Sequence, residues 1–274
     1  MIRESAPAKV NLILQVGSVR DDGLHELCSL FASIDLADGV TVRESTGTQD
    51  SVACPGVPEP NISLAAVRAF REASGIELPP LHVEIDKRVP VAAGLGGGSA
   101  DAAAVLRAAN AIGGPPLDAD ALRRVAASVG ADVASQIEPG HAIVEGAGEI
   151  VEPVTLPAMT VVLVPSPEGL ATADVYREAD RIGATRARLS PDSVRVAARG
   201  SLHDLARALE NDLESAALSL RPELAERLEA VRSAGALGAL VSGSGPTVFG
   251  VFEDPAAAGR AAKRLPGALT AGLR

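Results

Sequence analysis

The pattern of apolar and polar positions predicts a strand that leads through a glycine-rich loop into a helix. In residues 81–89, the apolar Leu81, Val83 and Ile85 alternate with polar residues, as in a strand with one buried face. Residues 100–111 are rich in alanine and other strong helix formers. Between these two segments, residues 94–98 contain four glycines. The predicted order is therefore strand, loop and helix.

Shorter signals of the same kind occur along the rest of the chain. Residues 64–75 carry apolar side chains at helical spacing, and residues 119–128 form a second predicted helix with Asp118 as its capping residue. Strands are predicted over residues 7–14, 39–44, 51–53, 160–166, 239–241, 247–252 and 268–273. A hairpin is predicted over residues 141–154, and helices around Tyr176, over residues 255–264 and throughout the charged region 202–233.

Helices and strands are mixed along the whole chain, and Pro157 lies between the hairpin and the next buried strand. We therefore predict an α+β protein with an N-terminal lobe, residues 1–157, and a C-terminal lobe, residues 158–274. A chain of 274 residues is long enough to give each lobe its own core.

Composition narrows the possible partners. The net charge of −10 argues against a nucleic-acid-binding surface, and no apolar run has the length of a membrane span. The N-terminus lacks the apolar region of a signal peptide, so we expect a cytoplasmic protein without membrane partners. Cys28 and Cys54 are too far apart for a zinc knuckle and are expected to be structural thiols. The sequence does not predict the oligomeric state.

The glycine-rich loop is the main candidate for binding chemistry. Glycines permit positive φ and bring backbone N–H groups close to an anion, and the following helix N-terminus favours negative charge. Ser99 can cap that helix or offer its hydroxyl to Mg²⁺. The loop is not a Walker A motif, because no lysine precedes Ser99, and it lacks the third glycine of a dinucleotide fingerprint. A phosphate loop is favoured, and the alternative is a flexible turn.

Other polar residues are ambiguous when each is taken alone. Lys9 and Asn11 lie on one face of a predicted strand, where a lysine is commonly solvent-exposed. His25 follows a turn and could be a packed histidine. Asp132 follows Gly130 at a predicted helix end, where an aspartate usually caps the next element. The Ser242–Pro246 segment, rich in glycine, is typical of a hairpin turn.

Taken together and in order, these segments resemble the GHMP kinases, the superfamily of galactokinase, homoserine kinase and mevalonate kinase. The resemblance covers nearly the whole chain and is strongest to the branch that phosphorylates 4-diphosphocytidyl-2-C-methyl-D-erythritol in non-mevalonate isoprenoid biosynthesis. The segments that carry it are residues 7–14, 21–27, 94–99, 130–133, 145–149, 211–214 and 241–249.

The resemblance implies a two-lobed fold, with an N-terminal lobe like ribosomal protein S5 and a ferredoxin-like C-terminal lobe. It implies an ATP- and Mg²⁺-dependent kinase of a small-molecule alcohol. By resemblance, Asp132 is the general base, Lys9 the cation beside the acceptor hydroxyl, Asn11 and His25 bind substrate, and Ser99 is near the metal. The ATP phosphates are expected on Pro90, Val91, Ala92, Ala93, Gly94, Leu95, Gly96, Gly97, Gly98, Ser99 and Ala100. The Ser242–Pro246 turn is expected to face the triphosphate.

Two departures from the family pattern keep other functions open. Leu24 stands where the family usually has a tyrosine that stacks on cytosine, and Ala134, Ser135 and Gln136 replace the usual Pro-Phe-Phe. The alternatives are a GHMP kinase of another specificity, acting on a sugar, homoserine or mevalonate, or a non-catalytic nucleotide-binding paralogue. Because Lys9 and Asp132 are both present, the paralogue is disfavoured, and the missing third glycine disfavours a dinucleotide oxidoreductase.

Overall fold

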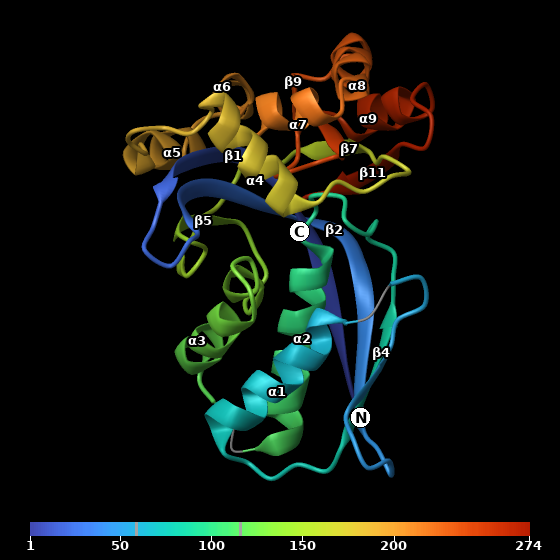
Figure 1. Ribbon diagram of the computed structural model, residues 1–274. Helices are drawn as coiled ribbons and strands as arrows, with labels where there is room; N and C mark the ends of the chain where they lie inside the picture. Colours follow the sequence, from blue (N-terminus) through green and yellow to red (C-terminus); the bar gives the residue numbers. More distant parts are fainter. Residues whose placement is uncertain (58–59, 115–116) are drawn as a thin grey trace.

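The computed structural model describes residues 1–57, 60–114 and 117–274. Within these ranges the strands form a larger and a smaller sheet, each covered by helices, and Figure 1 shows the two parts stacked, with the C-terminal helices above the N-terminal ones. The chain thus has the mixed α/β architecture that its hydrophobic pattern predicts.

The larger sheet is built on two long antiparallel strands, β1 (Ile2–Val19) and β2 (His25–Glu44). The far end of β2 pairs with β4 (Leu81–Asp86), and the end near His25 pairs with β5 (Ala142–Gly146). The sheet is completed by β3 (Ser51–Ala53) beside β4, β6 (Ile150–Pro153) beside β5, and β8 (Glu210–Asn211) beside β1. The predicted hairpin over residues 141–154 is confirmed by β5 and β6.

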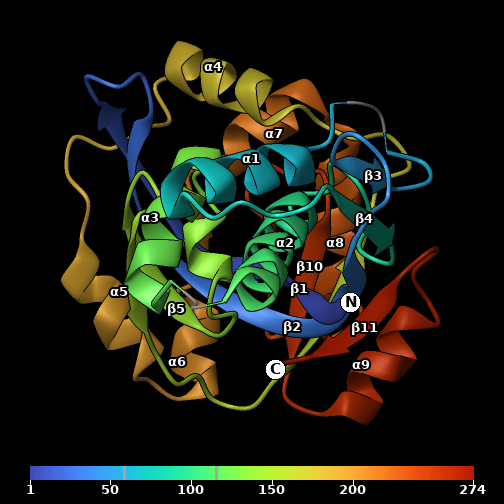
Figure 2. The same cartoon turned by 90° about the horizontal axis from the view of Figure 1, so that it is seen from below.

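Three helices pack on one face of this sheet: α1 (Ile62–Ser74), α2 (Gly97–Gly113) and α3 (Ala119–Val129). Figure 2 shows α1 and α2 in front of β1 and β2. The alanines of α2 are almost fully buried and allow close approach to the sheet, because they add little bulk. Asp118 caps α3 by accepting a hydrogen bond from the backbone N–H of Ala121 at 2.8 Å, as predicted.

The smaller sheet has the strand order β11-β7-β10-β9. Its strands are β7 (Thr160–Val164), β9 (Gly238–Val241), β10 (Val248–Phe252) and β11 (Leu269–Gly272). Helices follow β7 and β10, namely α4 (Thr172–Ile182), α5 (Pro191–Ala198), α6 (Leu202–Arg207), α7 (Glu214–Leu220) and α8 (Glu223–Ser233) before β9, and α9 (Pro255–Ala262) before β11. This antiparallel order with crossover helices is the ferredoxin-like arrangement expected of the C-terminal lobe.

Shared hydrophobic cores join the two parts. Leu14 and Val16 of β1 pack in one cluster with Val162 of β7 and Val241 of β9. A second cluster combines residues of β1 and β2 with Phe249 of β10. At the same junction, Arg186 donates hydrogen bonds to both carboxylate oxygens of Asp212, at 2.6 and 2.7 Å. The strands β1 and β2 therefore belong to both cores.

Several predicted elements differ from the observed ones. The N-terminal strand extends over 18 residues rather than eight, because residues 6–17 are buried throughout and show no alternation that would mark the strand ends. The charged region 202–233 is not continuously helical, since β8 and turns separate α6, α7 and α8. The helix α5 was not predicted. In the described part of the chain, no helix combines the length and apolar character needed to cross a membrane.

Candidate active site

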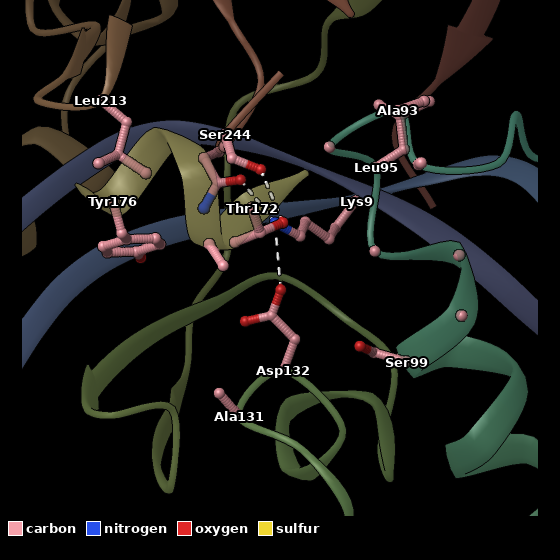
Figure 3. Close-up of a pocket in the computed structure, with 18 of the residues that line it drawn as sticks. Lys9, Ala93, Leu95, Ser99, Ala131, Asp132, Thr172, Tyr176, Leu213 and Ser244 are labelled. Atoms are coloured by element: carbon pink, nitrogen blue, oxygen red, sulfur yellow. Dashed lines mark hydrogen bonds and ion pairs between the residues drawn. The ribbon is translucent and has the colours of Figure 1, made fainter. Parts of the chain in front are cut away.

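A cavity of about 950 Å³ lies where the two parts of the molecule meet. Its walls come from β1, β2, the glycine-rich loop before α2, the segment after α3, α4, and the turn between β9 and β10. In Figure 3, Lys9 and Asp132 lie between the glycine-rich loop, which carries Ala93, Leu95 and Ser99, and the helix that carries Tyr176. All the site residues predicted from the sequence, except the buried Ala100, line this cavity.

The glycine-rich loop is held in a shape that requires glycine at two positions. Gly94 and Gly96 have φ of 74° and 69°. A Cβ atom on Gly94 would lie 2.1 Å from the carbonyl oxygen of Ser242, and one on Gly96 would lie 3.0 Å from Cε of Lys9. Ala92 also has positive φ, 51°, although it is not a glycine. The close approach of neighbouring groups therefore explains Gly94 and Gly96.

The helix N-terminus beside this loop differs from the sequence prediction in one respect. The helix α2 begins at Gly97, with Gly96 as the residue before it, so Ser99 lies inside the first turn and does not cap the helix. The expectation of Ser99 as a cap is thus wrong, because three glycines let the helix start earlier. Among the described residues, the Ser99 hydroxyl makes no hydrogen bond, and it lines the cavity.

The second glycine-rich turn packs directly against the first. Ser242 Oγ donates a hydrogen bond to the carbonyl of Gly94 at 3.0 Å, and Thr247 N donates to the carbonyl of Ala93 at 3.3 Å. Asn211 Nδ2 donates to the carbonyls of Val241 and Gly243, at 2.8 Å each. The predicted hairpin turn is confirmed, and it buttresses the phosphate loop while Gly243 and Ser244 line the cavity.

Lys9 is buried at the centre of the cavity wall. Its Nζ donates to Asn11 Oδ1 at 2.6 Å, and Asn11 Nδ2 in turn donates to Ser29 Oγ at 2.9 Å. The same Nζ lies 4.6 Å from the ring centroid of Phe31, which favours the cation. The register of β1 against β2 shifts on both sides of the Lys9–Asn11 segment, and such irregularities commonly aim side chains into a site.

Asp132 provides a carboxylate opposite Lys9. It follows Gly130, which ends α3, and its Oδ2 lies 3.5 Å from Lys9 Nζ. Its side chain is 32% exposed whereas that of Lys9 is 5% exposed, so the carboxylate faces the open cavity. Ser135 Oγ donates to the Asp132 carbonyl at 2.9 Å, within the turn that leads into the short 3₁₀ helix Ala134–Gln136. The predicted proximity of Lys9 and Asp132 is confirmed.

His25 lies at the other end of the cavity with both ring nitrogens near oxygen atoms. Nδ1 is 2.9 Å from the Gly17 carbonyl and therefore carries a proton, because a carbonyl oxygen only accepts. Nε2 is 3.4 Å from Asp180 Oδ2, on α4. The ring of Tyr176 packs on His25 with centroids 5.1 Å apart, and burial, with the nearby charge of Asp132, raises the pKa of this tyrosine. Leu24 is half exposed and also lines this end.

Some residues of the cavity were missed by the sequence analysis. Lys87 Nζ bonds to Asp38 at 2.5 Å and to Asp101 at 2.8 Å, and both Lys87 and Asp101 line the cavity. Burial raises the pKa of Asp101 to about 7, against the influence of Lys87 and with the added effect of Asp38. Thr172 and Ser244 share a hydrogen bond of 3.0 Å. Their partners lie far apart in the sequence, so no local pattern signals them.

The described residues offer no ready-made metal cluster: no three His, Cys, Asp or Glu side chains are grouped so as to hold an ion. This fits Mg²⁺ bound with a nucleotide, because Mg²⁺ typically takes few protein ligands together with phosphate oxygens and water. The unbonded hydroxyl of Ser99 and the carboxylate of Asp132 are the oxygen donors on either side of the loop mouth.

Comparison with known families gives a clear result. The model of the GHMP kinases N terminal domain matches residues 61–141, and that of the GHMP kinases C terminal domain matches residues 194–270. The chain belongs to the GHMP kinases. As a member of this family it uses ATP, and the two matched segments contain the glycine-rich loop of α2 and the second glycine-rich turn.

This GHMP kinase is similar along its whole length to curated relatives. It is 41% identical to the 4-diphosphocytidyl-2-C-methyl-D-erythritol kinase of Kineococcus radiotolerans, over 95% of this chain and 84% of that protein. It is 37% identical to the kinase of the same name from Shouchella clausii, over 96% of this chain and 89% of that protein.

Solved structures agree with the fold. A crystal structure of 4-(cytidine 5'-diphospho)-2C-methyl-D-erythritol kinase, 35% identical, covers 99% of both chains with a TM-score of 0.81. Homoserine kinase from Cytophaga hutchinsonii has a TM-score of 0.75 at 22% identity, covering 100% of this chain and 94% of its own, and this likeness shows the fold alone. The predicted two-lobed GHMP kinase fold is confirmed.

Proposed function

We propose that this GHMP kinase transfers the γ-phosphoryl group of ATP to the 2-hydroxyl of 4-diphosphocytidyl-2-C-methyl-D-erythritol, giving the 2-phosphate and ADP in isoprenoid precursor biosynthesis. The observation that carries the proposal is the position of Lys9 and Asp132 between the glycine-rich loop and the His25–Tyr176 end of one cavity. Relatives at 37–41% identity that bear the name of this kinase support the choice of substrate.

In this mechanism the acceptor hydroxyl binds beside Asp132 and Lys9. Asp132 accepts the hydroxyl proton as general base, and its exposure to the cavity leaves room for the substrate. Lys9 stabilises the negative charge that develops on the transferred group. Asn11 holds the Lys9 ammonium in place through the 2.6 Å hydrogen bond. Positioning and charge neutralisation are the main requirements of phosphoryl transfer, because its transition state is loose.

The ATP phosphates are assigned to the loop from Pro90 to Ala100. Backbone N–H groups at the start of α2 and the positive end of the helix dipole favour an anion there. Mg²⁺, carried with the nucleotide, would neutralise phosphate charge, and Ser99 would offer it a hydroxyl ligand. The division of the chain into lobes at residue 157 is part of the same proposal.

The cytosine is assigned to the cavity end formed by Leu24, His25 and Tyr176. His25 offers a ring nitrogen for hydrogen bonding, and Tyr176 offers an aromatic face beside it. Leu24 can cover a base but adds no ring stacking. An aromatic residue from α4 thus compensates in part for the leucine that replaces the usual tyrosine.

The test is ADP release, measured by a coupled assay with ATP, Mg²⁺ and 4-diphosphocytidyl-2-C-methyl-D-erythritol, beside homoserine, mevalonate and a panel of sugars. We expect turnover with the diphosphocytidyl substrate alone. Turnover with another alcohol instead would assign the protein a different specificity. ATP binding without turnover of any alcohol would indicate a non-catalytic nucleotide-binding protein.

A further inference from the structure

The helix α4 contributes one continuous face to the cavity. Its lining residues are Thr172, Ala173, Tyr176, Arg177 and Asp180, a spacing that places them on one side of a helix. Thr172 bonds to Ser244 near Lys9, whereas Asp180 lies beside His25. With a rise of 1.5 Å per residue, Arg177 stands about 7.5 Å beyond Thr172, and Asp180 about 12 Å beyond it. Arg177 therefore lies between the two ends of the proposed substrate site.

The other cations of the cavity are already neutralised by the protein. Among the described lining residues, the lysine and arginine side chains are Lys9, Lys87 and Arg177. Lys9 faces Asp132, and Lys87 is held between two carboxylates. Arg177 pairs with Asp174, one turn earlier, and its side chain is 77% exposed. An exposed pair of this kind is weak, so its arginine is free to exchange partners.

Charge balance indicates that such a cation is needed. The charged lining side chains comprise three cations, Lys9, Lys87 and Arg177, and three carboxylates, Asp101, Asp132 and Asp180, so their formal charges cancel. A substrate that carries a diphosphate between its base and its alcohol brings further negative charge to this surface. Arginine is suited to phosphate because its planar guanidinium donates two parallel hydrogen bonds.

We propose that Arg177 binds the diphosphate of the substrate, exchanging its contact with Asp174 for the phosphate oxygens. This inference rests on the proposed function, since it assumes a substrate whose diphosphate joins a base to the acceptor alcohol. Arg177 is then a residue that selects nucleoside-diphosphate-linked alcohols over free alcohols. Asp174 acts as its resting partner in the absence of substrate.

The experiment compares the variants Arg177→Gln and Arg177→Lys with the control Arg181→Gln. Arg181 is on the same helix, one turn further, and likewise pairs with an acid three residues earlier, but it does not line the cavity. Binding of cytidine 5′-diphosphate and of cytidine is measured by calorimetry, in the presence of saturating ADP and Mg²⁺. The KM for 4-diphosphocytidyl-2-C-methyl-D-erythritol and the kcat are measured in parallel.

For Arg177→Gln we expect cytidine 5′-diphosphate to bind about tenfold more weakly, the loss expected for one charge-assisted contact, with cytidine unchanged. KM for the substrate should rise by a similar factor, KM for ATP should stay constant, and Arg177→Lys should restore part of the loss. Arg181→Gln should match the wild type. Asp174→Asn, which removes the resting partner, should tighten the diphosphate but not cytidine.

An equal effect of Arg177→Gln on cytidine and its diphosphate, or no effect on either, overturns the assignment of Arg177 while leaving the proposed function intact if the wild type turns the substrate over. A wild type that does not phosphorylate this substrate overturns the proposed function itself, and with it the inference. The two failures are therefore distinguished by the wild-type assay.

Discussion

The two sides of the cavity are built from different materials. The phosphate-loop side consists of backbone from a contiguous segment, residues 90–100, together with the turn that buttresses it. The opposite side consists of side chains, contributed by the start of β2 and by α4, which lie about 150 residues apart. Backbone donors bind any phosphate, whereas side chains can be exchanged one at a time. The first side thus suits the common ATP, and the second suits the substrate that varies between family members.

The largest effect is expected between the two sides, at the catalytic pair. We predict that Asp132→Asn lowers kcat by about 10²- to 10⁴-fold, the usual contribution of a general base, while the affinity for ATP stays within about threefold of wild type. Lys9→Ala should also reduce kcat strongly. Steady-state kinetics and nucleotide binding check this, with Asp120→Asn on the exposed start of α3 as the control. Near-normal turnover in both variants would refute the mechanism.

A large effect is also expected within the loop, because its shape depends on backbone. The variant Gly94→Ala places a Cβ atom 2.1 Å from the Ser242 carbonyl oxygen, at a φ that alanine disfavours. We predict a loss of about 2 kcal/mol or more in the free energy of unfolding and at least about a tenfold loss of kcat/KM for ATP. Urea denaturation and kinetics measure the two quantities.

The matched comparison is Ala92→Gly in the same loop. Ala92 already adopts positive φ, so glycine relieves strain there, and the free energy of unfolding should stay the same or rise by up to about 1 kcal/mol. If both substitutions destabilise the protein equally, the loop is not limited by backbone geometry as described.

A moderate effect, in the favourable direction, is expected on the side-chain side. Leu24→Tyr supplies the ring that this cavity end lacks, and we predict a KM for the diphosphocytidyl substrate about five- to tenfold lower, since base stacking contributes about 1 to 3 kcal/mol per base. Leu24→Met, which keeps the volume without a ring, should leave KM within about twofold. A KM that is unchanged by tyrosine would show that the base does not reach Leu24.

The smallest effect concerns Glu214, which supports the second glycine-rich turn by accepting a hydrogen bond from Val241 N at 2.9 Å. Burial raises the pKa of Glu214, so the folded state binds its proton more readily than the unfolded state does. The stability that this proton confers is present at low pH and is lost as the pH rises through the folded-state pKa. Glu214→Gln keeps the acceptor without the charge.

Denaturation as a function of pH should therefore show Glu214→Gln and wild type equally stable in acid, with the variant gaining relative to wild type as the pH increases above the usual range of a glutamate. A stability difference that does not depend on pH would contradict the assignment of the shift to burial.

The same contrast explains what the sequence could predict. The glycine-rich loop was identified because its chemistry lies in six consecutive residues with glycines in most positions. Asp118, Gly75 and the 141–154 hairpin were likewise correct because caps and turns are local signals. Lys9 and Asp132 carried no distinctive local signal, and only the order of motifs along the chain pointed to them.

What the sequence could not predict depends on long-range contacts. Lys87 meets Asp38 across 49 residues, and Thr172 meets Ser244 across 72. Tyr176 was predicted only as part of a helix, since which face of α4 meets the cavity is decided by tertiary packing. The full length of β1 was missed for a related reason: a strand covered on both faces has no apolar alternation to mark its ends.

The strands that cross from one sheet region into the other core have a consequence for how the gene could be divided. A polypeptide ending near residue 157 would leave Leu14 and Val16 without the partners that they have in β7 and β9, and would expose apolar surface to water. The complementary polypeptide would have β8 with no neighbouring β1 to receive its hydrogen bonds. Neither half is therefore a good candidate for separate production, and co-expressed halves should be recovered as a complex rather than as independent proteins.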